Sequence, residues 1–320
     1  MARGGRRGAR RLHRLEVRQP HRRSGADVTV AVLGPGAVGG VLAVRLARAG
    51  VRVVCIARPD TARVIRSEGL SLRHGHDVEV VRPEAVSELR DPVELLLVTV
   101  KAPALDDALE RVQARAATVI PQLNGIEHME TLRRRLADSR VVAGSIGWIE
   151  AWLERPGTVV QNTPRVVMTL SSDADAATTE LLRRSGVDVR VNGSEAAVLW
   201  EKLARQAPVA AATALTQRPI GELRSDPTWR PRLQEAIGET CSVAAADGVP
   251  LAADAEWEII ESMPPLLTSS TARDIAAARP SELDAITGAA VRAAHRLGVP
   301  VPVLESLLAE AEETCRVRSR

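Results

Sequence analysis

Short apolar runs alternate with segments of helical periodicity between residues 28 and 146. The predicted strands are Val28–Leu33, Val51–Ile56, Glu94–Val100, Thr118–Leu123 and Val141–Ile146. The predicted helices between them are Val38–Ala49, Leu105–Ala114 and Glu127–Leu136. Strands that alternate with helices in this way form βαβ units with right-handed crossovers. The pattern therefore predicts an α/β domain with a doubly wound parallel sheet over residues 27–193.

The pattern changes after residue 193, where no further strand is predicted. The predicted helices of this half are Ser194–Leu215, Pro231–Asp247, Ala252–Met263 and Ser281–Leu297. The last of them has a serine at its expected N-cap and is followed by Gly298 and Pro300, which are typical stop signals. We expect residues 194–320 to form a second, all-helical domain.

The composition of the chain is unusual in its cations and its aromatic residues. Its 320 residues are 45% hydrophobic, which is enough for two ordinary cores and excludes a chain that is disordered throughout. There are 41 Arg but two Lys, three Asn, five Trp and neither Phe nor Tyr. So few aromatic side chains argue against a protein that stacks the bases of single-stranded nucleic acid. Each Lys and Asn is rare enough for its position to be informative.

The positive charge is concentrated at the start of the chain. Residues 1–26 hold nine Arg and one Glu, so this segment carries +8 and the other 294 residues carry −5. A basic globular surface that binds nucleic acid is therefore not expected. We interpret residues 1–26 as an Arg-rich, disordered tail, with a polyanion-binding arm or an organelle address as the alternatives.

The positions of the cysteines, the histidines and the apolar runs indicate the cellular compartment and whether a metal site is expected. Cys55, Cys241 and Cys315 are far apart and form no disulfide or metal motif, which fits a reducing compartment. No apolar run free of Gly and Pro is long enough to span a membrane. His74 and His76 have no third ligand nearby, so we expect no metal site. These features predict a cytoplasmic protein without a membrane partner.

A glycine motif follows the first predicted strand and opens the first predicted helix. Its residues are Gly34, Pro35, Gly36, Ala37, Val38 and Gly39. In such a loop one Gly makes the tight turn, the second lets a pyrophosphate approach the backbone, and the third lets the helix pack on the strand. The amides of the helix N-terminus then bind the phosphates. We therefore expect a Rossmann-type dinucleotide site, with a purely structural turn as the alternative.

The end of the second predicted strand indicates the choice of cofactor. A carboxylate there would hold the ribose 2′-hydroxyl of NAD, whereas an Arg would accept the 2′-phosphate of NADP. Arg58 occupies this place, and Asp60 comes two positions later. The position favours NADP over NAD, although a solvated arginine is an alternative in so Arg-rich a chain.

The rare Lys and Asn residues fall at informative places. Lys101 and Asn124 follow two neighbouring predicted strands, at the carboxyl edge of the sheet where open α/β folds bind ligands. Lys202 lies on the first helix of the second domain. A lysine is a compact donor whose pKa falls on burial, so it suits proton donation near neutral pH better than arginine does.

Taken in order, these motifs resemble the ketopantoate reductase (2-dehydropantoate 2-reductase) family, over about residues 28 to 306. The matching elements are the glycine loop with Gly40, Lys101-Ala102, Asn124-Gly125, Trp200-x-Lys202-Leu203, Ser269-Ser270-x-x-x-Asp274, and Ser281-Glu282-Leu283-Asp284-x-Ile286-x-Gly288. The ordered set is far more specific than any single motif. The resemblance implies a Rossmann domain, a helical domain, and an active site in the cleft between them.

The resemblance also implies a role for each matching residue. Arg58 would contact the 2′-phosphate of NADP, and the glycine loop, Lys101, Asn124 and Glu282 would complete the cofactor site. Lys202 would be the general acid in reducing a 2-oxo acid, which the family identifies as 2-dehydropantoate on the way to (R)-pantoate and pantothenate. Glu282 would help to orient Lys202. The implied substrate-binding residues are Asn124, Lys202, Gln206 and Ser270.

Three positions depart from the family pattern. Gln206, Ala210 and Leu267 stand where the family often has Asn. Gln206 keeps a side chain that can hydrogen-bond to substrate, but Ala210 does not. Two alternatives therefore remain open: a reductase of another 2-oxo acid or of an imine, and a catalytically silent NADP-binding protein. The sequence also leaves the oligomeric state open, a homodimer being one alternative.

Overall fold

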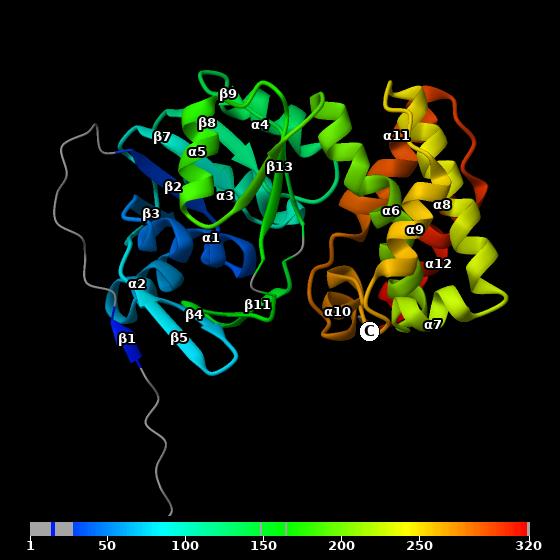
Figure 1. The fold of residues 1–320 in the computed structure, drawn as a ribbon, viewed down its shortest axis with the longest axis horizontal. Helices are drawn as coiled ribbons and strands as arrows, with labels where there is room; N and C mark the ends of the chain where they lie inside the picture. The colour runs from blue at the N-terminus through cyan, green and yellow to red at the C-terminus, as the bar shows by residue number, and fades with distance from the viewer. Residues whose placement is uncertain (1–13, 17–27, 148, 164, 319–320) are drawn as a thin grey trace, which may run out of the picture.

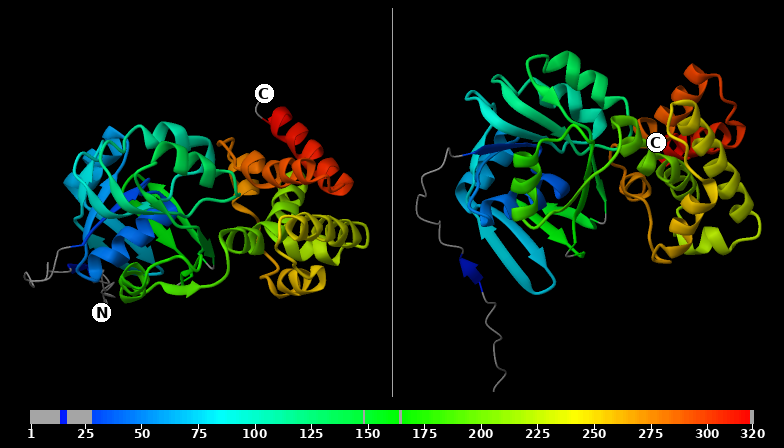
Figure 2. Two further views of the ribbon diagram at one scale, coloured as in Figure 1. Left: turned by 90° about the horizontal axis from the view of Figure 1, so that it is seen from above. Right: turned by 45° about the horizontal axis from the view of Figure 1, so that its top comes forward.

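The structure is a computed structural model that describes residues 14–16, 28–147, 149–163 and 165–318. An α/β part, which ends at about residue 193, lies beside an all-helical part (Figure 1; Figure 2). The long helix α6 (Glu195–Thr216) is the first element of the helical part. The expected order of a Rossmann-type sheet followed by helices is confirmed.

A parallel sheet forms the centre of the α/β part. In spatial order its strands are β6 (Glu84–Val86), β3 (Arg52–Ile56), β2 (Thr29–Leu33), β7 (Val93–Val98), β8 (Ala116–Pro121) and β9 (Arg140–Val141). The chain moves outward from β2 to β6 and then returns to the other side of β2. The strand order therefore reverses between β2 and β7, which is the point where folds of this type bind dinucleotides.

Helices cover both faces of this sheet and bury an aliphatic core on each. The helices are α1 (Ala37–Arg48), α2 (Pro59–Glu68), α3 (Leu105–Leu109), α4 (His128–Arg135) and α5 (Ala176–Arg184). Side chains of α1, α2 and α5 share one hydrophobic cluster, and those of α3 and α4 share the other. Since the central strands are buried on both faces, they read as continuous apolar runs in the sequence.

Two smaller sheets were not predicted from the sequence. One has the order β1 (Arg14–Glu16), β5 (Asp77–Val81), β4 (Leu70–His74), β12 (Thr158–Gln161) and β11 (Ala151–Arg155). The other consists of β10 (Gly144–Gly147), β13 (Val167–Leu170) and β14 (Asp188–Val191). The single strand expected over residues 141–146 is thus divided between β9 and β10. Of the expected tail, residues 14–16 form β1, and the rest lies outside the described residues.

Helices make up the remainder of the described chain. After α6 they are α7 (Ile220–Ser225), α8 (Trp229–Ala246), α9 (Ala253–Ser262), α10 (Ser270–Ala276), α11 (Ala289–Leu297) and α12 (Pro302–Arg318). Ser194 caps α6 as expected, because its side chain accepts a hydrogen bond from the Ala197 amide. None of the described helices is long and apolar enough to cross a membrane.

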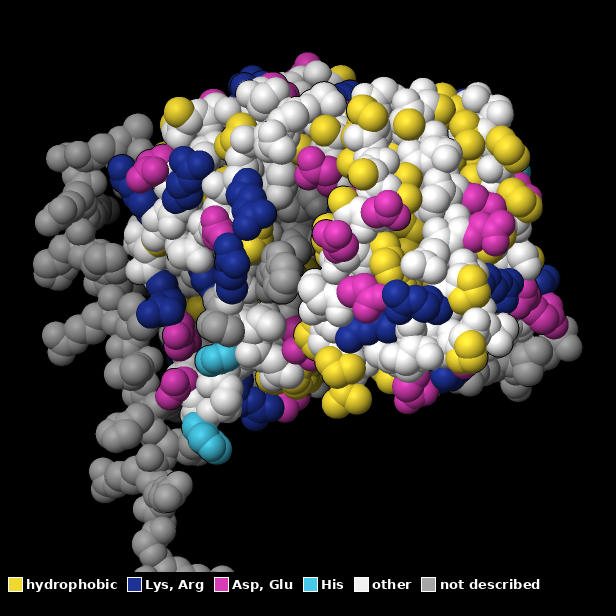
Figure 3. All heavy atoms as spheres, turned by 45° about the vertical axis from the view of Figure 1, so that its right-hand side comes forward, with side chains coloured by type: hydrophobic (Ala, Val, Ile, Leu, Met, Phe, Trp, Pro, Cys, Tyr) yellow, Lys and Arg dark blue, Asp and Glu magenta, His cyan; other side chains and the backbone are white. Residues whose placement is uncertain are grey.

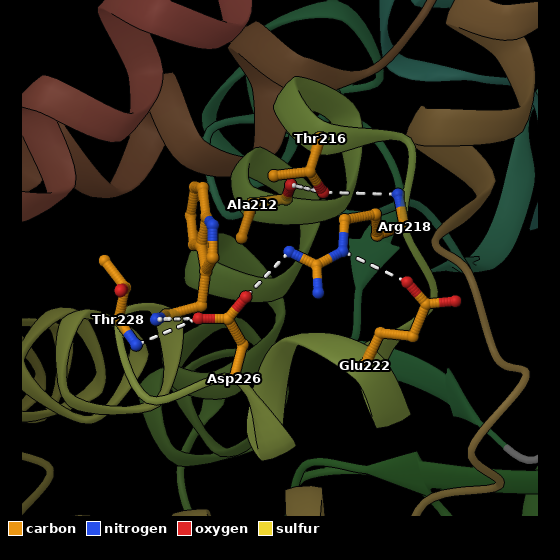
Figure 4. Close-up of polar contacts among 7 residues, drawn as sticks. Ala212, Thr216, Arg218, Glu222, Asp226 and Thr228 are labelled. Atoms are coloured by element: carbon orange, nitrogen blue, oxygen red, sulfur yellow. Dashed lines mark hydrogen bonds and ion pairs between the residues drawn. The ribbon is translucent and has the colours of Figure 1, made fainter.

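A polar network fixes the segment between α6 and α8, which includes α7 (Figure 4). The Arg218 guanidinium donates to Glu222 and to Asp226, at 3.0 Å each. The other carboxylate oxygen of Asp226 accepts from the amides of Thr228 and Trp229 at the start of α8. These contacts join the residues that follow α6 to α7 and to the start of α8. Opposite charges also alternate on the surface of the molecule. On the face drawn in Figure 3, Lys and Arg side chains lie beside Asp and Glu side chains.

The helix expected from Ser281 begins differently. A π-helical turn, η2 (Asp284–Gly288), precedes α11, and neither element has a side-chain cap. Ser281 and Glu282 therefore lie in the segment that leads into the turn. A π-turn carries one extra residue, so it changes the direction in which the preceding side chains project, and such turns are frequent at functional sites.

Candidate active site

The glycine loop connects β2 to α1 with very little space around two of its glycines. Gly34 has φ +87°, and its amide donates to the Ile56 carbonyl at 3.0 Å. A Cβ on Gly39 would lie 2.3 Å from Thr99 Oγ1 and 2.4 Å from the Gly34 carbonyl oxygen. Gly34 is therefore needed for the left-handed turn and Gly39 for the close approach of α1 to the sheet.

Gly36 differs from these two because it borders open space. A Cβ at this position would meet one atom within 4 Å, the Gly34 carbonyl oxygen at 3.9 Å. The helix α1 begins at Ala37, with no side-chain cap and no acidic residue in its first turn. Its first amides therefore point at an accessible surface with the positive end of the helix dipole behind them. The loop from Gly34 through Pro35 and Val38 fits the pyrophosphate of a dinucleotide.

Arg58 lies at the carboxyl end of β3, next to the strand that leads into the glycine loop. It is the N-cap residue of α2 and is exposed. Arg63 forms an ion pair with Asp60 at 2.9 Å, whereas no ion pair found among the described residues involves Arg58. The Arg58 guanidinium is thus accessible to an anion, on the side of the loop where the second strand ends.

Lys202 is held by acceptors from the other part of the molecule. Its Nζ donates to Asn124 Oδ1 at 2.8 Å and to the Ile146 carbonyl oxygen at 3.0 Å. Gln206, one turn later on α6, donates from Nε2 to the same Asn124 oxygen at 3.0 Å. Asn124 thus brings together two side chains of one helix face, at the carboxyl edge of the sheet.

Glu282 completes this polar network from the segment before the π-turn. Its Oε2 accepts from Asn124 Nδ2 at 3.0 Å, and its Oε1 accepts from the Ala102 amide at 3.1 Å. Glu282 is 6% exposed. A buried carboxylate is costly without partners, and here both oxygens are satisfied by groups of the α/β part. The segment around Glu282 therefore closes the site from the helical side.

The environment of Lys202 changes its acidity. Burial lowers the pKa of Lys202 from 10.5 to about 8, and the nearby Arg205 acts in the same direction. The carboxylate of Glu282 opposes the shift because it stabilises the ammonium form. A lysine with a pKa near 8 is largely protonated at neutral pH and yet can release its proton, which are the properties of a general acid.

Lys101 lies at a second contact between the two parts of the molecule. Its Nζ is 2.6 Å from Asp274 Oδ2 on α10, and Arg279 Nε donates to the other Asp274 oxygen at 3.1 Å. The Asp274 side chain is 7% exposed, whereas that of Lys101 is 47% exposed. Lys101 therefore lies where the two parts of the molecule meet, with Asp274 as its ionic partner, and its assignment to the cofactor site stays a prediction.

Ser270 is not joined to the polar network around Lys202. It is the exposed first residue of α10, and no hydrogen bond found among the described residues connects it to Lys202, Asn124 or Glu282. The neighbouring Ser269 caps the helix, accepting from the Ala272 amide at 3.0 Å and from Thr213 Oγ1 at 2.7 Å. The assignment of Ser270 to the substrate site stays a prediction.

Three groups of the site were not singled out from the sequence. The Ile146 carbonyl and the Ala102 amide are backbone groups, which every residue carries, so no residue type marks them. Asp274 had a signal, since it belongs to the motif that begins at Ser269, but no role was assigned to it.

Two family models match the chain and together span most of it. The model described as ketopantoate reductase PanE/ApbA matches residues 30–173, and the model of the C-terminal part of the same family matches residues 196–313. The chain belongs to the ketopantoate reductase PanE/ApbA family. The resemblance drawn from the sequence motifs is thereby confirmed.

Individual relatives match over most of their length. A 2-dehydropantoate 2-reductase of Pyrobaculum aerophilum is 31% identical over 285 residues, which cover 86% of this chain and 94% of that protein. An uncharacterized oxidoreductase of Bacillus subtilis, YkpB, is 28% identical over 295 residues, which cover 88% of this chain and 97% of that protein. The structure also matches the crystal structure of a PanE/ApbA family ketopantoate reductase from Ralstonia eutropha, with a TM-score of 0.82 and 30% sequence identity. The match covers 92% of this chain and 100% of the Ralstonia eutropha chain.

Membership in the family sets the class of reaction. As a member of the ketopantoate reductase family, this protein is an NAD(P)-dependent oxidoreductase that acts on 2-oxo acids. The glycine loop, with open space at Gly36 and the uncapped amides of α1, fits a dinucleotide.

Proposed function

We propose that this protein catalyses the NADPH-dependent reduction of 2-dehydropantoate to (R)-pantoate, a step of pantothenate biosynthesis, with Lys202 as the general acid. The observation that carries the proposal is the placement of Lys202: Nζ lies 2.8 Å from Asn124 Oδ1 and 3.0 Å from the Ile146 carbonyl, with its pKa lowered to about 8. Membership in the family supports this choice of substrate.

The chemistry needs a proton donor at the ketone oxygen. When bound, the nicotinamide of NADPH supplies the hydride. As the ketone is reduced, negative charge develops on its oxygen, and the Lys202 ammonium stabilises that charge and then donates a proton to it. Asn124 and the Ile146 carbonyl hold Nζ in place, while Glu282 fixes Asn124 and keeps the ammonium form populated. We therefore assign Lys202 and Glu282 as the catalytic residues.

Two features support NADP over NAD as the cofactor. The exposed Arg58 guanidinium stands at the end of β3, where an adenosine 2′-phosphate would need a cation, and has no carboxylate partner among the described residues. The nearest acidic residue in sequence, Asp60, pairs instead with Arg63. In this proposal Gly34–Gly39, Arg58, Lys101, Asn124 and Glu282 hold the cofactor.

A second candidate is the reduction of a different 2-oxo acid, and Ala210 favours it, whereas Gln206 is compatible with 2-dehydropantoate. Gln206 Nε2 is already bonded to Asn124, whereas its buried Oε1 has no hydrogen-bond partner among the described residues. That oxygen can accept a hydrogen bond from a hydroxyl, such as the 4-hydroxyl of 2-dehydropantoate. Ala210, however, is 1% exposed and offers no polar atom. The polar contacts available to the substrate are therefore fewer than in the usual family pattern.

The test is NADPH oxidation by the purified protein over a panel of 2-oxo acids. We expect saturable turnover with 2-dehydropantoate and a higher kcat/KM than with oxo acids that lack the 4-hydroxyl. A higher kcat/KM for a bulkier or purely apolar oxo acid would replace the substrate and keep the chemistry. Tight NADPH binding without turnover of any oxo acid or imine would instead identify a catalytically silent NADP-binding protein.

A further inference from the structure

The side chain of Thr99 connects the end of β7 to the glycine loop. Thr99 is the first residue after β7, and its amide donates to the Leu33 carbonyl at 3.0 Å, which continues the pairing of β7 with β2. Its hydroxyl oxygen Oγ1 lies 2.9 Å from the Leu33 carbonyl oxygen and 2.8 Å from the Gly34 carbonyl oxygen. A hydroxyl carries one proton, so Thr99 shares this proton between two consecutive carbonyls.

The two contacts of Thr99 differ in how far they depend on the residue type. The amide bond to Leu33 belongs to the backbone, so any residue except proline would supply it. The bond to the Gly34 carbonyl needs a side-chain donor of this length, which serine also has but valine lacks. The hydroxyl therefore does something for the glycine loop that the pairing of the two strands does not require.

The Gly34 carbonyl has a second donor inside the loop. The Gly36 amide donates to it at 2.7 Å and closes a three-residue turn around Pro35. A carbonyl oxygen has two lone pairs, and the Thr99 hydroxyl and the Gly36 amide provide a donor for each. The same oxygen lies close to α1, since a Cβ on Gly39 would be 2.4 Å from it. The Gly34 carbonyl is therefore fixed between the end of β7 and the first turn of α1.

The direction of this carbonyl matters for an anion at the loop. Gly34 has φ +87°, and glycine backbones at positions 34 and 36 restrict the loop little by themselves. Rotation of the Gly34 carbonyl toward the open space at Gly36 would place a partial negative charge where a phosphate approaches. That charge would oppose the positive end of the α1 dipole. A loop that is already fixed also loses less conformational entropy when a ligand binds.

We propose that Thr99 is a positioning residue of the dinucleotide site, whose hydroxyl holds the Gly34 carbonyl so that the loop presents amides to the pyrophosphate. Thr99 acts through the loop and needs no contact with the cofactor. The proposal rests on the part of the proposed function that places the pyrophosphate at Gly34–Gly39. It does not depend on the identity of the 2-oxo acid, on Lys202, or on the choice between NAD and NADP.

The test compares two variants of the full chain by titration calorimetry. Thr99→Val keeps the shape of the side chain without its hydroxyl, and Thr99→Ser keeps the hydroxyl. The probes are ADP, which has the pyrophosphate group common to NAD and NADP, and adenosine, which has no phosphate. We expect Thr99→Val to weaken ADP binding about tenfold and adenosine binding by less than about twofold. Thr99→Ser should bind ADP as the wild-type chain does.

Thr179→Val is the matched control for lost stability. Thr179 lies on α5, is 4% exposed, and donates from Oγ1 to the Asp175 carbonyl at 2.9 Å, so this variant also removes a hydroxyl that donates to the backbone. We expect it to lower the free energy of unfolding about as much as Thr99→Val does, with unchanged ADP affinity. If Thr99→Val does not fold, Thr99→Ala replaces it in the comparison with Thr99→Ser.

The outcomes separate the role of Thr99 from the placement of the pyrophosphate. Wild-type affinity for ADP in Thr99→Val would overturn the proposal. Equal losses of ADP and adenosine binding would also overturn it, because they would indicate general damage to the domain, and so would a loss in Thr99→Ser as large as in Thr99→Val. If the wild-type chain itself bound ADP no more tightly than adenosine, the pyrophosphate would not lie at the glycine loop, and both proposals would be wrong.

Discussion

Lys202 and Asn124 are 78 positions apart and belong to different parts of the fold, yet Nζ of the first donates to Oδ1 of the second at 2.8 Å. Asn124 is in turn bonded to Glu282. An ammonium group desolvated at a domain junction is costly, and this arrangement supplies the acceptors and the negative charge that keep it there. The proposed acid therefore depends on the contact between the two parts of the molecule.

Replacing Lys202 by Ala should remove the proton donor and leave the glycine loop intact. We expect kcat with 2-dehydropantoate to fall by about 10²–10⁴-fold, as for other lost general acids, while the Kd for NADPH changes little. Steady-state NADPH oxidation and a fluorescence titration of the cofactor measure the two quantities. Glu201→Gln, on the same helix, is the control and should retain activity. Near-normal turnover by Lys202→Ala would remove Lys202 from the mechanism.

The pH profile of kcat/KM should show the titration of Lys202. Its pKa is about 8 and its protonated form is the active one, so kcat/KM should fall about tenfold per unit at pH values well above 8. Glu282→Gln removes the charge that raises this pKa, so the alkaline limb of the variant should move to lower pH. An unchanged limb in the variant would show that another group titrates there.

The same pKa predicts how the free energy of unfolding changes with pH. Because the pKa of Lys202 is lowered from 10.5 to about 8, the unfolded chain binds more protons than the folded chain between these pH values. Stability should therefore rise with pH across this window and be insensitive to Lys202 below it. Relative to Lys202→Met, the wild-type chain should gain about 3 kcal/mol over the window, measured by denaturant unfolding at several pH values. Parallel curves for the two proteins would contradict the assigned shift.

The sequence predicted the parts of the fold whose pattern is local and strong. The strands β2, β3, β7 and β8 are buried on both faces and read as apolar runs. The hairpin Leu70–His74 with Asp77–Val81 was missed because its strands are only partly buried and carry charged residues. The π-turn was also missed, since Ser281 has the residue type of an N-cap and nothing local indicates the extra residue.

For the site, rarity was the useful signal. The chain has only two Lys and three Asn. Both lysines and one asparagine lie where the two parts of the molecule meet: Lys101, Lys202 and Asn124. The partners of Lys101 and Lys202 were not predictable to the same degree. Asp274 is one of many acidic residues, and the Ile146 carbonyl is a backbone group whose position depends on the sheet that contains β10.

Arg58 is expected to determine the preference for NADPH over NADH. Loss of a hydrogen bond to a charged group costs about 1.5–3 kcal/mol, so Arg58→Ala should weaken NADPH binding by roughly ten- to a hundredfold and NADH binding far less. Equilibrium titration with both cofactors measures the ratio. Arg63→Ala is the matched control, because Arg63 is also exposed but pairs with Asp60. An equal loss of affinity for both cofactors would contradict the assignment of Arg58 to the 2′-phosphate.

Gly36 and Gly39 should respond to alanine in opposite ways. A Cβ at Gly39 would collide with Thr99 Oγ1 and the Gly34 carbonyl, so Gly39→Ala should lower the free energy of unfolding by a few kcal/mol, on the order of other overpacked sites. A Cβ at Gly36 meets no atom closer than 3.9 Å, so Gly36→Ala should fold with near-normal stability. Its added methyl group would occupy the surface that a pyrophosphate approaches, and NADPH affinity should fall at least about tenfold. Thermal unfolding and cofactor titration of both variants separate a folding glycine from a binding one, and normal NADPH affinity in Gly36→Ala would place the phosphates elsewhere.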